Sequence, residues 1–134
     1  MKIDQNYLKT LLEACQATEQ PTFNIEDLHV AGIDHKNPQF EFHMKILTDQ
    51  NFVERDDGED GFGLYKTIDG LNSWALMPLR LTGTGHEFIE ALENKEVWET
   101  IKRDFKGASL GTLKTVSMQL LDGYVKKKIS NILD

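Results

Sequence analysis

The chain has 134 residues, 40% of them hydrophobic, and a formal net charge of −7. This length supports one hydrophobic core and is short for two ordinary domains. There is no run of about 18 apolar residues, and the charged N-terminal residues are unlike a signal peptide, so we expect a cytoplasmic protein with no membrane attachment.

The charge is distributed unevenly along the chain. Residues 1–35 carry two basic and six acidic groups, residues 36–100 carry six and thirteen, and residues 101–134 carry seven and three. The three segments therefore have net charges of −4, −7 and +4. Only the last segment is basic. The net charge of −7 disfavours a general attraction to polyanions.

The first predicted element is an amphipathic helix over residues 4–18, with Asp4 as its N-cap. Its apolar stripe includes the single cysteine, Cys15, which we interpret as a buried small hydrophobic residue. Pro21 prevents the helix from continuing. Leu28, Val30 and Gly32 then predict a short strand and its turn.

Asn37 and Pro38 are typical of a helix start, because proline at the first helical position loses no hydrogen bond. The predicted helix extends to about Gln50 and turns one face to the core, formed by Phe40, His43, Met44 and Leu47. On that stripe His43 is expected to be a hydrogen-bonded core residue.

Two strands are predicted next, over residues 52–55 and 74–81. Pro78 cannot donate to a ladder, so the second strand is expected at a sheet edge. Between them, residues 56–73 are rich in glycine and acidic residues. They predict a long exposed hairpin loop with a short strand near residues 64–68.

The remainder of the chain is predicted to be helical. Thr84 and Glu87 have capping-box spacing, and the helical period continues through Val97, Trp98, Ile101 and Phe105 towards Gly107. Ser109 then caps a last helix that extends to about Ile132, with apolar residues on more than one face.

No motif in the chain supports catalysis or metal binding. Residues 107–111 fit G-x-S-x-G, but they follow a helix and no histidine comes after Ser109, which is better read as an N-cap. Residues 56–67 lack the third and twelfth ligands of a calcium loop, and the four histidines lack zinc spacing. We therefore expect no enzyme activity, catalytic residue, metal or cofactor.

The order of these elements predicts an α+β fold of winged helix-turn-helix type, with a small antiparallel sheet and a helical C-terminal extension. Residues 1–82 would form the winged-helix-like core, with the acidic wing loop at 56–73. Residues 83–134 would pack on it within a single domain. The first helix of the helix-turn-helix pair would have to fit into residues 32–36, ahead of the recognition helix at 37–50.

A family resemblance supports this fold. The segments Phe42-His-Met-Lys-Ile-Leu47, Leu79-Arg-Leu-Thr82, Gly85-His-Glu-Phe-Ile89 and Val97-Trp98 resemble a family of small, often prophage-associated bacterial proteins. That family is known as a domain of unknown function. The resemblance covers roughly residues 1–125. It implies a winged-helix-like fold and a mobile-element setting, and it supplies no activity or ligand.

Two functions are compatible with these observations. In the first, the protein is a regulator that binds double-stranded DNA, with Gln39 and Lys45 at the major groove and with phosphate contacts from Arg55, Lys66 and Arg80. In the second, the same scaffold binds a protein partner and no DNA.

The last helix also predicts a homodimer. Its apolar residues cover too much of its circumference for one side of a small domain, and Val116, Met118, Ile129 and Ile132 are left without a surface. Lys126, Lys127 and Lys128 would repel their copies in a parallel pair, so an antiparallel pairing is expected. The alternative is that the helix at residues 97–105 covers these side chains within one chain.

Overall fold

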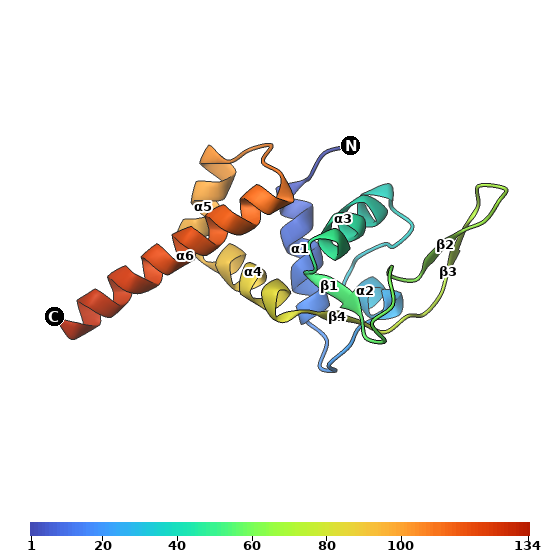
Figure 1. Ribbon diagram of the computed structural model, residues 1–134, viewed down its shortest axis with the longest axis horizontal. Helices are drawn as coiled ribbons and strands as arrows, with labels where there is room; N and C mark the ends of the chain where they lie inside the picture. The colour runs from blue at the N-terminus through green and yellow to red at the C-terminus, as the bar shows by residue number, and fades with distance from the viewer.

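The computed structural model describes residues 1–134, which form helices and four short strands (Figure 1). In chain order the elements are α1 (Gln5–Gln16), α2 (Ile25–Val30), α3 (Pro38–Asp49), β1 (Val53–Arg55), β2 (Leu64–Lys66), β3 (Asn72–Trp74), β4 (Leu79–Leu81), α4 (Gly83–Glu93), α5 (Lys95–Asp104) and α6 (Leu110–Leu133). None of the helices combines the length and the hydropathy that crossing a membrane requires. The α+β class is thus confirmed.

Three helices begin where the sequence predicts. The Asp4 carboxylate accepts the N–H of Tyr7 at 3.0 Å at the start of α1. At the start of α3 the Asn37 side chain accepts the N–H of Gln39 at 3.0 Å. At the start of α6 the Ser109 hydroxyl accepts the N–H of Thr112 at 3.2 Å. Each cap satisfies an N–H that has no partner within its helix, and this fixes the helix start.

The predicted strand at residues 28–32 is wrong, because this segment belongs to α2. Asn24 and Asp27 form a capping box in which each side chain accepts the other residue's N–H, at 3.1 and 3.0 Å. In a strand, Leu28 and Val30 would lie on the same face. Here Leu28 is buried in the core and Val30 is 89% exposed, so the two residues do not share a face. The helix that precedes α3 is therefore α2, and residues 32–36 are the turn between the two.

The main sheet pairs β1 with β4 in antiparallel orientation, with Val53 opposite Leu81 and Arg55 opposite Leu79. On its other side Leu79 exchanges two 2.8 Å hydrogen bonds with Phe23. The expected edge position of this strand is wrong, since β4 lies between β1 and Phe23. Pro78 is compatible with that position because it precedes the strand, where no backbone N–H is needed for hydrogen bonds to a neighbouring strand.

The remaining two strands form a hairpin that projects from the body (Figure 1). The short strand predicted near residues 64–68 is confirmed as β2. Its partner β3 ends at Trp74, so the single strand predicted over 74–81 is divided into β3 and β4. Phe62 is buried at the root of the hairpin, with its ring centroid 6.2 Å from that of Phe40 and 6.3 Å from that of Trp74.

Thr82, not Thr84, caps α4. The Thr82 hydroxyl accepts the N–H of Gly85 at 3.0 Å and donates to the carbonyl of Asn51 at 2.6 Å. At Gly85 the helix comes so close to the sheet that an added Cβ would lie 2.2 Å from the Phe52 carbonyl oxygen. A turn later the ring of Phe88 stacks on that of Phe52, with centroids 4.6 Å apart.

The C-terminal helices form a second layer. Asn94 ends α4 and caps α5 through its side chain, which accepts the N–H of Val97 at 3.1 Å. Both α4 and α5 pack against α6, whose residues Leu110 and Leu113 join the core. The second half of α6 leaves the body and projects away from it (Figure 1).

Candidate functional site

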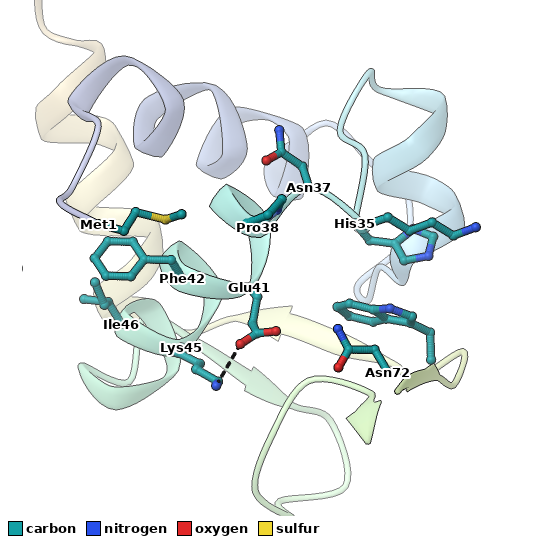
Figure 2. A pocket seen from close by; sticks show the side chains of 11 residues that line it. Met1, His35, Asn37, Pro38, Glu41, Phe42, Lys45, Ile46 and Asn72 are labelled. Carbon is teal, nitrogen blue, oxygen red and sulfur yellow. Dashed lines mark hydrogen bonds and ion pairs between the residues drawn. The ribbon is translucent and has the colours of Figure 1, made fainter. Parts of the chain in front are cut away.

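A cavity lies along α3, from Pro38 to Ile46. It has a volume of about 500 Å³ and is bounded by α3, the N-terminal residue and β3 (Figure 2). Its lining consists of Met1, His35, Lys36, Asn37, Pro38, Glu41, Phe42, Lys45, Ile46, Asn72 and Trp74. Helix α3 and the hairpin thus meet at a hollow with charged, polar and apolar walls.

Glu41 is the electrostatic centre of this hollow. Its Oε2 accepts hydrogen bonds from Lys45 Nζ and from Lys66 Nζ, both at 3.0 Å (Figure 2 shows the first). These two hydrogen bonds hold the pKa of Glu41 below its ordinary value. The carboxylate therefore links α3 to β2 and pairs with two lysines that the sequence predicts as DNA contacts, offsetting one of their two positive charges.

The other two predicted phosphate contacts are also paired with carboxylates. Arg55 Nε donates to Asp57 at 3.0 Å, and its Nη2 donates to the second oxygen of the same carboxylate. This pair holds the pKa of Asp57 below its ordinary value. Arg80 Nη1 donates to Glu54 Oε1 at 2.8 Å, directly across the β1–β4 ladder.

Gln39, the predicted base contact, is turned partly inward. Its side chain is half-buried, and its Oε1 is buried without a hydrogen-bond partner. Its carbonyl oxygen lies 2.7 Å from His43 Nδ1. The structure thus brings Lys45 and Lys66 together at Glu41, while Gln39 lies on another face of α3 with its amide oxygen out of solvent.

His43 is a core residue with both ring nitrogens bonded, as the sequence predicts. Nε2 accepts the backbone N–H of Asp4 at 3.0 Å, so the proton resides on Nδ1, which donates to the Gln39 carbonyl. Burial lowers the pKa of His43 below 6.5. The imidazole is therefore neutral and joins the start of α1 to α3.

Sequence reasoning missed His35 and Trp74 at the far wall of the cavity. Their ring centroids are 4.9 Å apart in an edge-to-face arrangement, and His35 Nδ1 is buried without a partner. Burial also lowers the pKa of His35. The two residues are 39 positions apart in the sequence, so no local spacing could have paired them.

The four predicted dimer residues occupy different environments on α6. Val116 and Met118 are half-buried, and Met118 packs against the core. Ile129 is 50% exposed and Ile132 is 73% exposed. Since Ile129 and Ile132 stay exposed, the covering of all four side chains within one chain does not occur.

Cys15 and Ser109 have structural roles in the fold. Cys15 is buried, and burial raises the pKa of its thiol, which disfavours the reactive thiolate. Ser109 caps α6, as predicted. No three or more His, Cys, Asp or Glu side chains lie together in an arrangement that could hold a metal ion.

Comparison with known proteins gives one match. No curated protein and no solved structure matches the chain. A family model described as Hypothetical protein (DUF2513) matches residues 2–111. The match includes every element from α1 to α5 and ends where α6 begins, whereas the sequence resemblance was expected to reach about residue 125. The chain belongs to this family of proteins with a domain of unknown function.

Proposed function

We propose that the chain is a cytoplasmic winged-helix regulatory protein. The order of elements supports this assignment, since a helix, the Phe23 strand position, α2, α3, β1, the β2–β3 hairpin and β4 follow one another as in a winged helix-turn-helix. In that scheme α3 is the recognition helix and the hairpin is the wing. The family resemblance adds an origin in mobile elements to the proposal.

The function that the site supports best is binding of a protein partner without binding of DNA. Lys45, Lys66, Arg55 and Arg80 are each paired with a carboxylate of the same chain. Exposed ion pairs contribute only about 0–1 kcal/mol each, so a phosphate could displace them. The observation that carries the proposal is the net charge of residues 36–100, which carry thirteen acidic and six basic groups. This surface repels a nucleic-acid backbone.

A titration of labelled duplex DNA at 50 mM and 200 mM salt tests this function. We expect no saturable binding at either concentration. A protein that makes several phosphate contacts loses about 10³-fold or more in affinity between these two conditions. Binding with such a salt dependence would overturn the protein-binding function.

DNA binding is a second candidate, because Lys45 of α3 and Lys66 of the hairpin converge on one carboxylate. If duplex DNA is bound, Lys45→Glu weakens binding to all sequences, whereas Gln39→Ala matters mainly at a preferred site. Unchanged affinity in both variants would remove α3 from the DNA interface.

A further inference from the structure

The β2–β3 hairpin has a free edge on each side, because its sheet consists of these two strands only. The N–H of Thr67 donates to the carbonyl of Leu71 at 2.9 Å. At the other end, the N–H of Ala75 donates to the carbonyl of Gly63, also at 2.9 Å. The pairing therefore extends by one rung beyond each end of the two strands, and Figure 1 shows the hairpin projecting from the body.

These two hydrogen bonds determine which backbone groups of β3 point outward. Hydrogen-bonded and non-hydrogen-bonded pairs alternate along an antiparallel ladder. Both end rungs are hydrogen-bonded, so the rungs that contain Asn72 and Trp74 are the non-hydrogen-bonded ones. The N–H and C=O groups of Asn72 and Trp74 thus point away from β2, towards the free edge.

The free edge of β3 lacks charge and proline, which commonly keep other strands away from an open edge. The eight residues from Gly70 to Met77 include no charged residue and no proline. They belong to the longest uncharged run of the chain, whereas β2 carries Lys66. On either side of β3, Leu71 is 65% exposed and Leu76 is 55% exposed. Of the two edges, that of β3 is therefore the one open to another strand.

The cavity of about 500 Å³ borders this edge. Its lining includes Asn72 and Trp74 of β3 and no residue of β2. Figure 2 shows Asn72 across the cavity from Glu41 of α3. Neighbouring strands lie about 4.8 Å apart, and residues directly opposite each other turn their side chains to the same face. A residue that an added strand placed beside Trp74 would therefore point its side chain into this cavity.

The occupant of the edge follows from the groups that it must satisfy. The outward N–H and C=O groups repeat every second residue along β3. Another extended polypeptide offers both acceptors and donors at this spacing, and edge pairing of this kind is a common mode of peptide recognition. Phosphate groups of a nucleic acid or a lipid accept hydrogen bonds, but they have no donors for the carbonyl groups of the edge.

We propose that a protein partner docks by adding an extended segment to the free edge of β3, with one large apolar side chain in the cavity. This inference rests on the protein-binding function above and names the kind of partner. Phe42, Ile46 and Trp74 give the cavity apolar walls. Of its charged groups, Lys45 and Glu41 already pair with each other. An apolar side chain therefore fits better than a charged one.

A displayed library of random decapeptides, selected on the full chain, supplies the probe. We expect peptides with apolar residues at alternate positions, whose affinity is measured by fluorescence anisotropy of the labelled synthetic peptide. N-methylation of the peptide then tests the pairing. Methyl groups on the alternate amides that face β3 should weaken binding about tenfold, and methyl groups on the intervening amides should leave it unchanged. A loss of affinity without this two-residue period would overturn the inference.

Asn72→Pro tests the edge on the protein side, because it removes an N–H that the hairpin itself does not use. Lys66→Pro is the matched control, since it makes the same change on the same rung at the opposite edge. We expect about tenfold weaker peptide binding in Asn72→Pro only. Slow hydrogen exchange of the Tyr65 and Ser73 amides shows that the hairpin is intact. Where a variant loses it, the methylated peptides decide.

The remaining outcomes separate this inference from the function on which it rests. Failure to select any peptide, or equal affinity in the two proline variants with intact hairpins, would overturn the inference and leave the protein-binding function standing. DNA binding with a steep salt dependence would overturn that function even if a peptide binds. A wild-type mass of twice 15.3 kDa that Asn72→Pro halves would place a second copy at the edge and overturn the inference.

Discussion

The imidazole of His43 accepts the backbone N–H of Asp4 at 3.0 Å, which joins the N-cap of α1 to the middle of α3. The bond requires a neutral ring, because Nε2 must keep its lone pair. Burial lowers the pKa of His43 below the ordinary value of 6.5. Protonation at Nε2 would replace this acceptor with a second donor facing an N–H.

The stability of the protein should therefore depend on pH in a defined direction. Since the pKa of His43 is lower in the folded state, the unfolded chain binds more protons below pH 6.5. The free energy of unfolding keeps its full value above pH 6.5 and falls as the pH decreases from there. Urea unfolding at pH 7.5 and pH 5.5 measures this fall.

His35 also has a lowered pKa and should add to the same pH dependence. The contribution of His43 is therefore measured by comparing the wild type with a variant that lacks His43. In His43→Gln the fall between pH 7.5 and pH 5.5 should be smaller than in the wild type, and in His35→Gln most of it should persist. An equal fall in wild type and His43→Gln would show that the Asp4 contact has no role in the pH dependence.

Thr82→Ala should destabilise the protein by about 1–2 kcal/mol, because it removes the N-cap of α4 and the bond to the Asn51 carbonyl. Thr84→Ala is the matched control two residues later, and it should change the free energy of unfolding by less than about 0.5 kcal/mol. Chemical denaturation of both variants decides which threonine is the cap. A larger loss in Thr84→Ala would restore the capping box expected from the sequence.

Gly85→Ala should destabilise the protein by about 1–3 kcal/mol, because its Cβ would meet the Phe52 carbonyl oxygen and push α4 from the sheet. At Gly83 a Cβ would have no neighbour within 4 Å, so Gly83→Ala should be neutral or slightly stabilising. Thermal unfolding of the two variants compares the same chemical change two positions apart. Equal midpoints would contradict the close approach of α4 to β1.

The hairpin segment 56–73 should be the first part of the domain body to be cut in limited proteolysis. It is glycine-rich, and most of its side chains are exposed apart from Phe62 and Leu64. Glu41→Gln removes the negative charge that pairs with Lys66 and should raise the cleavage rate about two-fold, in line with a surface ion pair. Asp49→Asn, an acid on the same helix that pairs with no lysine, should leave the rate unchanged. Cleavage within α4 before the hairpin would contradict the prediction.

Much of the fold could be predicted from local signals. Asp4, Asn37 and Ser109 mark three helix starts because an N-cap needs only its own first turn. Helix α2 has an equally local signal, since Asn24 and Asp27 have capping-box spacing, but the alternation of Leu28 and Val30 favours a strand. The true cap of α4 was missed because Thr82 is selected by contacts with Asn51, 31 residues away.

The candidate site could be predicted only in part. The sequence identified Lys45 and Lys66, but their common partner Glu41 follows from the docking of the hairpin on α3, across 25 residues. His35 and Trp74 meet for the same reason. By contrast, the exposed apolar end of α6 was expected, because a helix with too many apolar residues for one neighbour shows this excess in its sequence.

The hairpin is held by two forces that respond to salt in opposite directions. At its root, Phe62 and Trp74 are anchored by apolar contacts, which strengthen in salts such as sulfate. Along its length, Lys66 is held by the Glu41 carboxylate at the surface, where screening acts over about 8 Å at physiological ionic strength. We therefore expect rising ionic strength to weaken the Lys66–Glu41 contact while the contacts of Phe62 and Trp74 persist, so that the hairpin would move about Phe62 without leaving the domain.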